Sequence, residues 1–232
     1  MVEIKGLEKF SPRDYPGVIS ATVFLGSCNF RCPYCHNAEL VLNPDDLPTF
    51  PMGYITDFLD SRKDWLEGIC ITGGEPLLHP DLVDFLSLLK ERELSVKLDT
   101  NGSFPSQLEA LIEKKLVDSI AMDVKAPLER YEEVTRTKVD RGKIRKSIDI
   151  IMGSGVEYVF RLTAVPGLID EEGMTEIGRM LEGAKAFQIQ QFVPENTLDP
   201  AFELLEPFKR DGIRALGRCV EQFFSEVRFE EA

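Results

Sequence analysis

The chain has 232 residues, of which 43% are hydrophobic and 29% are charged, and its formal net charge is −13. This length suits one α/β domain over residues 1–232 better than two small domains. The acidic charge argues against binding to nucleic acid or to an anionic membrane surface, because both need a basic footprint.

Targeting signals are not apparent in the sequence. No apolar run approaches the roughly 20 residues that a membrane-spanning helix needs, and the segment 1–17 lacks the apolar core of a secretory signal. We therefore expect a cytoplasmic protein. In that setting the five cysteines argue against a disulfide framework, and a cluster among them favours a metal or redox role.

Short apolar runs alternate with amphipathic stretches along the chain. The predicted strands are 17–26, 68–74, 94–102, 117–125, 156–165 and 186–193. The predicted helices are 81–92, 105–116, 141–155, 170–184 and 208–227. This alternation implies an α/β fold of parallel strands with helical crossovers. Periodicity alone leaves open whether the six units close a partial barrel or form an open, doubly wound sheet.

Polar clusters directly follow the first four predicted strands. They are Cys28–Cys35, Gly73–Pro76, Asp99–Gly102, and Asp123 with Lys125. Functional loops lie at the carboxyl ends of parallel strands. We therefore expect these clusters to meet at one mouth of the fold.

The segment GSCNFRCPYC places Cys28, Cys32 and Cys35 on one loop. A structural zinc site has four closed ligands, and an iron–sulfur cluster usually takes four cysteines. Three thiolates would leave one metal position open, which indicates chemistry at the metal. The remaining Cys70 and Cys219 lie in apolar patterns and are predicted to be core thiols.

A zinc site completed by His36 is an alternative, as is an iron–sulfur electron-transfer module without catalysis. However, His36 directly follows Cys35, and adjacent residues in a tight loop rarely both reach one ion. We therefore expect His36 to contact a bound ligand rather than the metal.

The pattern Cys28-x-x-x-Cys32-x-x-Cys35 after a strand resembles the signature of radical S-adenosylmethionine enzymes, and GGEP is similar to the family's segment that meets the methionyl amino group. Further stretches resemble the activating enzymes of glycyl-radical proteins. They are 6–17, 28–37, 98–102 and 123–125. The first of them is most similar to anaerobic ribonucleoside-triphosphate reductase activators. The resemblance covers most of the chain and implies a partial (β/α)6 barrel.

The resemblance implies a [4Fe-4S] cluster held by the three cysteines, with S-adenosylmethionine on the fourth iron. One electron would cleave this cofactor to methionine and a 5′-deoxyadenosyl radical. The radical would abstract a glycine hydrogen in a large partner, an anaerobic ribonucleotide reductase-like protein. Flavodoxin or ferredoxin is the implied electron donor.

The resemblance also implies the contacts to S-adenosylmethionine. The expected residues are Tyr34, His36, Gly73, Gly74, Glu75, Asp99, Asp123, Lys125 and Arg161. Tyr34 is expected beside the adenine, and Asp123 with Lys125 beside the ribose and carboxylate. Asp99 with Thr100 would lie near the amino group or a monovalent cation. Without the cysteine motif, Asp123 and Lys125 would indicate only a structural ion pair, because they share one strand face.

Arg161 lies among apolar neighbours in the fifth predicted strand. A buried arginine needs an anionic partner, and the candidates are the cofactor carboxylate, Glu75 and Asp123. Related activators often carry a histidine after the sixth strand. This chain has none there, and Gln191 and Asn196 are the nearest substitutes.

A radical enzyme acting on a small molecule, such as a 7-carboxy-7-deazaguanine synthase, is the closest alternative function, since those enzymes share the compact size. The chain shows no recognisable glycyl-radical loop of its own. The target glycine is therefore expected in another protein.

Overall fold

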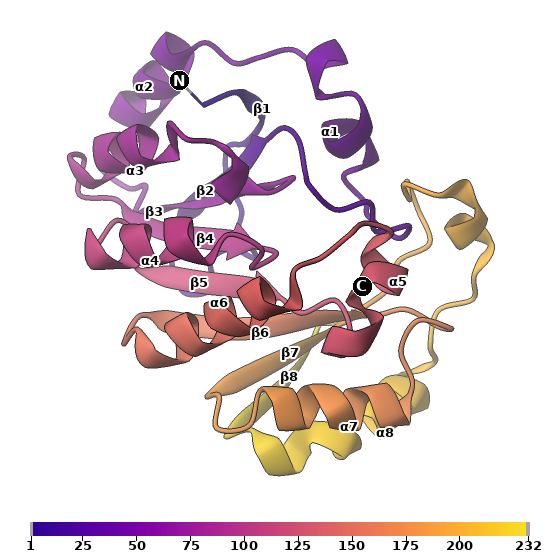
Figure 1. Cartoon of the computed structure of the whole chain (residues 1–232). Helices are drawn as coiled ribbons and strands as arrows, with labels where there is room; N and C mark the ends of the chain where they lie inside the picture. Colours follow the sequence, from indigo (N-terminus) through magenta and orange to yellow (C-terminus); the bar gives the residue numbers. More distant parts are fainter. Residues whose placement is uncertain (1, 231–232) are drawn as a thin grey trace. The chain divides into compact units, whose positions relative to one another are not determined.

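The computed structural model describes residues 2–230, and the chain divides into two compact units. The first unit comprises the chain up to Asn29, Glu39–Thr100 and Ser106–Ile120. The second comprises Phe30–Ala38, Asn101–Pro105 and the chain from Ala121 onward. Strand order in the sheet follows the chain, from β1 to β8 (Figure 1). A single catalytic domain over residues 1–232 stays a prediction.

The first unit contains a sheet of mainly parallel strands with helices between them. Its strands are β1 (Ile4–Glu8), β2 (Ser20–Leu25), β3 (Gly68–Gly73) and β4 (Ser95–Thr100). The helices in this half of the chain are α1 (Ala38–Leu42), α2 (Met52–Ser61), α3 (Leu82–Lys90) and α4 (Pro105–Glu113). Strands β2, β3 and β4 are parallel neighbours, whereas β1 pairs antiparallel with β2. The carboxyl ends of β2, β3 and β4 therefore lie at one edge.

The parallel strands of the first unit each have a buried apolar face. Ile69 and Ile71 of β3 and Leu98 of β4 are fully buried. Helix α3 has its apolar residues at helical spacing, and Leu86 and Leu89 are fully buried.

The second unit repeats the alternation of parallel strands and helices. Its strands are β5 (Ser119–Asp123), whose first two residues belong to the first unit, β6 (Glu157–Ala164), β7 (Ala186–Gln191) and β8 (Glu226–Glu230). Its helices are α5 (Tyr131–Thr135), α6 (Arg141–Gly153), α7 (Glu171–Met180) and α8 (Arg210–Val220). Strands β6, β7 and β8 are parallel neighbours. Helices α7 and α8 lie side by side (Figure 1).

Helix boundaries in the second unit follow from local chemistry. The Asp140 carboxylate accepts hydrogen bonds from the backbone N–H groups of Gly142 and Lys143, which caps the start of α6. Beyond the end of α6, Gly155 has a φ of +73°, the left-handed conformation that glycine adopts without strain. Gly155 therefore follows the end of α6 at the position where a helix commonly gives way to a left-handed residue.

The six predicted strands correspond to β2–β7, but two edge strands were missed. β1 carries a register irregularity between Ile4 and Gly6, which breaks its alternating pattern. The predicted helix 208–227 was wrong at its end, because α8 ends at Val220 and β8 begins at Glu226. The apolar residues of the predicted helix extend beyond Val220 because Phe224, which lies after the end of α8, stacks on Phe187 with 4.9 Å between the ring centroids.

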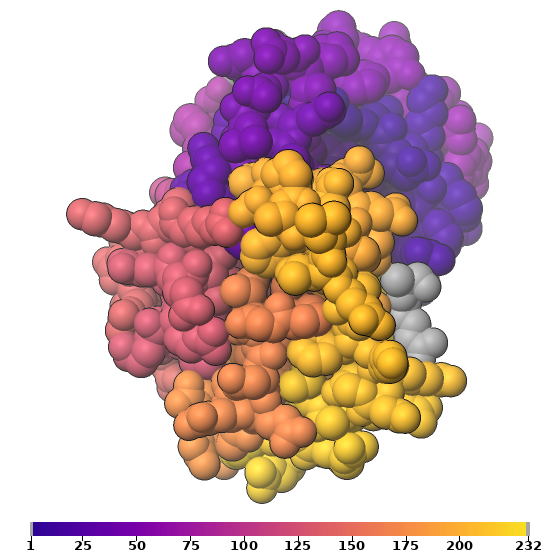
Figure 2. Space-filling view, turned by 90° about the vertical axis from the view of Figure 1, so that its right-hand side faces the viewer, coloured from indigo at the N-terminus to yellow at the C-terminus, as the bar shows by residue number. Residues whose placement is uncertain are grey.

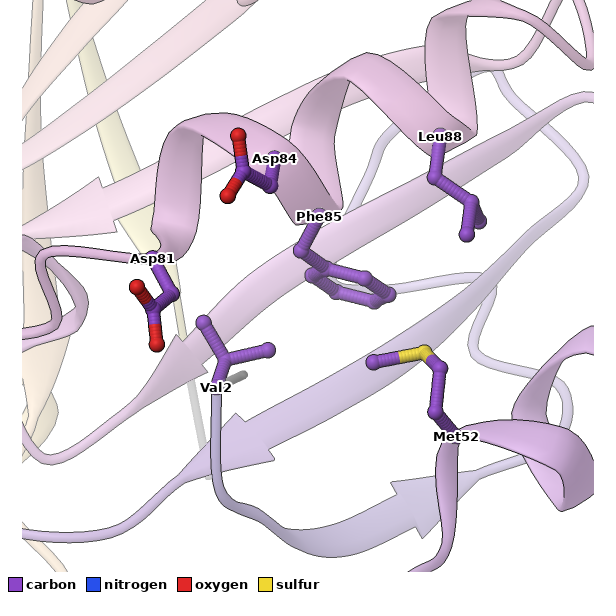
Figure 3. Close-up of a pocket in the computed structure, with 6 residues that line it drawn as sticks. All are labelled: Val2, Met52, Asp81, Asp84, Phe85 and Leu88. Carbon is purple, nitrogen blue, oxygen red and sulfur yellow. The ribbon is translucent and has the colours of Figure 1, made fainter.

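Within residues 2–230, no helix has both the length and the apolar character needed to cross a membrane. The first unit also contains a pocket with a volume of about 160 Å³ (Figure 3). Its lining residues are Val2, Met52, Asp81, Asp84, Phe85 and Leu88. None of the predicted cofactor or metal residues lines this pocket, so the candidate site lies elsewhere.

Candidate active site

The cysteine loop enters the second unit at Phe30. The Cys35 N–H donates to the Cys32 carbonyl oxygen at 3.0 Å, which closes a tight turn between the two thiols. Cys32 and Tyr34 are buried. The turn therefore holds two of the three predicted ligands next to each other on a fixed backbone.

Cys28 lies in the first unit, two residues beyond Gly26, and is half-buried. The preceding Ser27 has a φ of 66°, a left-handed conformation that is uncommon outside glycine. The Gly74 N–H donates to the Leu25 carbonyl at 2.9 Å, and the Glu75 N–H donates to the Ser27 carbonyl at 2.9 Å. The segment after β3 therefore fixes the backbone that leads into Cys28.

Gly73 and Gly74 are required by this close approach of two backbones. A Cβ on Gly73 would overlap the Leu25 carbonyl oxygen, and a Cβ on Gly74 would overlap the Ser27 carbonyl oxygen. Gly73 also has a φ of +117°. The immediate reason for the glycine pair is thus the packing of the chain before Cys28, and a ligand contact by the same backbone stays a prediction.

Glu75 is fully buried and links two segments of the first unit. Its Oε1 accepts from the Leu77 N–H at 3.1 Å and from the Thr100 hydroxyl at 2.7 Å. These bonds connect the turn after β3 with the end of β4. Such an arrangement positions the loop, in keeping with a supporting role for Glu75.

Asp99 pairs with a lysine that the sequence analysis missed. The Lys97 ammonium donates to the Asp99 carboxylate and also lies 3.7 Å from the Cys70 sulfur. Lys97 is buried. The signal was present in the alternation of β4, because residues two apart on a strand share one face.

In the second unit, Asp123 lies between two cations. The Arg161 Nε donates to Asp123 Oδ1 at 2.8 Å, and the Lys125 Nζ donates to Asp123 Oδ2 at 3.0 Å. The Lys125 N–H also donates to the hydroxyl of buried Tyr131 at 3.2 Å. The Asp123 carboxylate is therefore shared by two cations. Of the three partners proposed for Arg161, the structure shows Asp123.

The ionisation of these groups follows from burial and charge. Burial would raise the pKa of Asp123, but Arg161 and Lys125 outweigh it and hold that pKa well below its ordinary value. Burial would lower the pKa of Lys125, but Asp123 keeps it well above its ordinary value. The cluster is therefore fully ionised near neutral pH.

Burial raises the pKa of the Cys32 thiol to about 11, although Lys125 opposes the rise. Burial also raises the pKa of Cys35 and, with Cys32, raises the pKa of Tyr34 well above its ordinary value. These electrostatic effects show that Cys32, Tyr34 and the Asp123 cluster are close neighbours within the second unit.

His36 contacts the chain that follows β7. Its ring centroid lies 6.3 Å from that of Phe192, and burial lowers its pKa. The Leu198 N–H donates to the Cys35 carbonyl at 3.0 Å, and the Asp199 N–H donates to the Pro33 carbonyl at 2.9 Å. The segment after β7 therefore holds the cysteine loop in place.

The sequence matches the family model described as the radical SAM superfamily over residues 22–177. It is 34% identical over 231 residues to a provisionally named glycyl-radical enzyme activating enzyme of Methanocaldococcus jannaschii, with 97% of this chain and 94% of the relative covered. It is 27% identical over 211 residues to the pyruvate formate-lyase-activating enzyme of Clostridium pasteurianum, with 85% of this chain and 84% of the relative covered.

The fold is similar to the crystal structure of Streptococcus suis SuiB, with a TM-score of 0.67 and 16% sequence identity. The match covers 89% of this chain and 47% of that chain, so this protein spans about half the length of SuiB. The expected radical SAM fold is confirmed. The chain belongs to the radical SAM superfamily and, within it, to the glycyl-radical enzyme activating enzymes, whose cofactors are a [4Fe-4S] cluster and S-adenosylmethionine.

Proposed function

We propose that this enzyme activates an anaerobic ribonucleoside-triphosphate reductase-like protein by abstracting a hydrogen atom from one of its glycines. The observation that carries the proposal is the 34% identity over 97% of the chain to a glycyl-radical enzyme activating enzyme. The stretches 6–17 and 98–102 favour the reductase branch. A bound cluster would supply the electron for cleavage of S-adenosylmethionine to methionine, and the adenosyl part would take up the glycine hydrogen as 5′-deoxyadenosine.

Cys28, Cys32 and Cys35 are proposed to hold the cluster. All five cysteines are thiols, and thiolates are the ligands that iron–sulfur clusters take. Iron must displace the Cys32 proton, which burial otherwise retains. Over residues 2–230 no group of three or more His, Cys, Asp or Glu side chains is already gathered as a metal site, so this ligand set stays a proposal.

The Asp123 cluster is proposed to bind the carboxylate and ribose of S-adenosylmethionine. Lys125 can donate to a carboxylate, and the Asp123 oxygens can accept from ribose hydroxyls. Buried Tyr34, next to Cys32 in the loop, is proposed to pack beside the adenine. His36 is proposed to contact the cofactor rather than the metal.

In the first unit, Gly73, Gly74 and Glu75 are proposed to present backbone groups to the methionyl end of the cofactor. The bonds from Gly74 and Glu75 to the chain before Cys28 give this segment a fixed path. Asp99 with Thr100 is proposed to bind the amino group or a monovalent cation. Flavodoxin or ferredoxin is the proposed electron donor, and residues 1–232 are proposed to act as one catalytic domain.

The test is anaerobic mixing of the cluster-loaded enzyme, S-adenosylmethionine, dithionite and the reductase, followed by electron paramagnetic resonance. We expect the doublet of a glycyl radical, and its loss when the candidate glycine of the reductase is changed to alanine. An enzyme that forms 5′-deoxyadenosine but never gives the doublet would contradict the proposal. Turnover of a small molecule without any protein partner would instead identify the alternative, a synthase of the carboxydeazaguanine type.

A further inference from the structure

The chain between β7 and α8 presents an acidic surface with apolar side chains. We call residues 193–208 the docking segment. It contains Glu195, Asp199, Glu203 and Glu206 and no lysine or arginine. Leu204 has 88% of its surface exposed, the largest value among the exposed large apolar side chains of the described chain. Figure 2 shows this segment in yellow-orange, facing the viewer.

The docking segment is held in one conformation by its own polar groups. The Thr197 N–H donates to the Glu203 carboxylate at 3.2 Å, and the Thr197 hydroxyl donates to the Asp199 carbonyl at 2.8 Å. The Asp199 carboxylate accepts from the Ala201 N–H at 3.0 Å, capping the short turn that ends at Leu204. An ordered segment that exposes leucine has little conformational entropy to lose on binding.

The same segment is attached to the cysteine loop. Besides the two backbone bonds from Leu198 and Asp199, Arg136 at the end of α5 donates to the Asp199 carboxylate at 2.6 Å and lies 5.7 Å above the Phe202 ring. Single exposed leucines are common on protein surfaces. Leu204 differs because half-buried Phe202 and Leu205 lie near it in the chain and because Leu198 and Asp199 of the same segment bond to the cysteine loop.

We infer that the docking segment binds the glycyl-radical protein, through an apolar contact at Leu204 and through basic residues of the partner opposite Glu195 and Glu206. This inference rests on the proposed function. Arg136 pairs with Asp199, and the three other carboxylates of the segment favour a basic partner surface and repel an acidic one. A redox protein with an acidic docking face would therefore bind elsewhere. A contact at this position brings the partner close to Cys35 and His36.

The test compares Leu204→Ser and Glu206→Lys with two control variants that make the same chemical change elsewhere. Ile19→Ser alters a leucine-sized exposed side chain directly before β2, whereas Cys28 follows the other end of that strand. Glu113→Lys reverses an exposed charge at the end of α4. Two rates are measured for each cluster-loaded enzyme. They are glycyl-radical formation on the reductase and 5′-deoxyadenosine formation without the reductase.

We expect Leu204→Ser to slow glycyl-radical formation about tenfold, the loss of a moderate interface contact, while 5′-deoxyadenosine formation without reductase is unchanged. Glu206→Lys should act in the same direction, and its effect should shrink as salt is raised. Control-like rates for both variants would overturn the inference and leave the proposed function standing. Absence of a glycyl radical with the wild-type enzyme would overturn both.

Discussion

At the residue scale, the glycines after β3 show how a motif can serve the fold before it serves a ligand. Gly74 lies against the carbonyl of Ser27, and its N–H bonds to Leu25. The backbone of the GGEP segment thereby sets the direction in which the chain reaches Cys28. If the same backbone also contacts a ligand, its conformation is set by this packing before the ligand binds.

Gly74→Ala is expected to destabilise the protein by about 2 kcal/mol or more, because the new methyl group would displace backbone rather than a mobile side chain. Gly153→Ala is the matched control. Nothing lies within 4 Å of a Cβ at Gly153, and alanine favours helix by about 0.5–1 kcal/mol. Urea unfolding of the two variants checks this, and equal stabilities would contradict it.

Asp123 is the residue on which the charge balance of the second unit depends. Its side chain is 29% exposed, and those of Lys125 and Arg161 are 16% and 15% exposed. Removal of the carboxylate would leave two largely buried cations without their shared partner. Removing one partner of a buried ion pair destabilises the folded state even where the intact pair adds little to stability.

Asp123→Asn is expected to cost about 2 kcal/mol at pH 7, below the full penalty for a buried pair because the site is partly exposed. The folded-state pKa of Asp123 is lowered, so its contribution is present above about pH 4, the ordinary carboxyl pKa, and is lost as the pH falls further. The stability gap between wild type and variant should therefore narrow below about pH 4.

Denaturant unfolding at pH 7 and pH 3 measures this gap. Asp149→Asn is the control, because Asp149 forms an exposed pair with Arg145 at 3.3 Å and should change stability by less than about 0.5 kcal/mol at either pH. A gap for Asp123→Asn that stays constant down to pH 3 would show that its ionisation does not stabilise the fold.

At the element scale, the sequence predicted the six strands β2–β7 because each is a short segment that contains buried apolar residues. It did not predict β8, since Glu226–Glu230 is a short, largely exposed edge strand whose only apolar residues are Val227 and Phe229. Helices α1 and α5 are only five residues long, too short to show a helical period. Such elements are defined by tertiary contacts that a single sequence does not display.

Part of the candidate site was also readable from the sequence. The cysteine spacing and the GGEP segment indicated the family. The pairing of Asp123 with Lys125 followed from the alternation of side chains along a strand. The link from Glu75 to Thr100 and the contacts of the segment after β7 with the cysteine loop were not predicted. Both join residues far apart in the chain, and local periodicity contains no information about such contacts.

Glu75 is predicted to hold the turn after β3 to the end of β4. Glu75→Leu should destabilise the protein by about 2–4 kcal/mol, because it removes the buried acceptor of the Leu77 N–H and the Thr100 hydroxyl. Glu75→Gln keeps a carbonyl acceptor and should recover at least half of that loss. Thermal unfolding of the two variants distinguishes them, and equal losses would argue against a hydrogen-bonding role.

At the scale of the whole molecule, the net charge of −13 and the acidic docking segment point to the same class of partner. A protein with this charge repels acidic surfaces and is attracted to basic ones at long range. Activating enzymes of this group act on a glycyl-radical protein. Substitutions in the docking segment are then expected to change glycyl-radical formation on the partner without changing 5′-deoxyadenosine formation.

The most direct test is the anaerobic formation of 5′-deoxyadenosine from S-adenosylmethionine and dithionite by the iron- and sulfide-reconstituted protein. We expect product from the wild type and from Cys219→Ala, whose thiol lies on α8 outside the cysteine loop. Cys32→Ala should give none. Product from Cys32→Ala at the wild-type rate, or no product from wild-type protein that carries a full cluster, would contradict radical chemistry at these three cysteines.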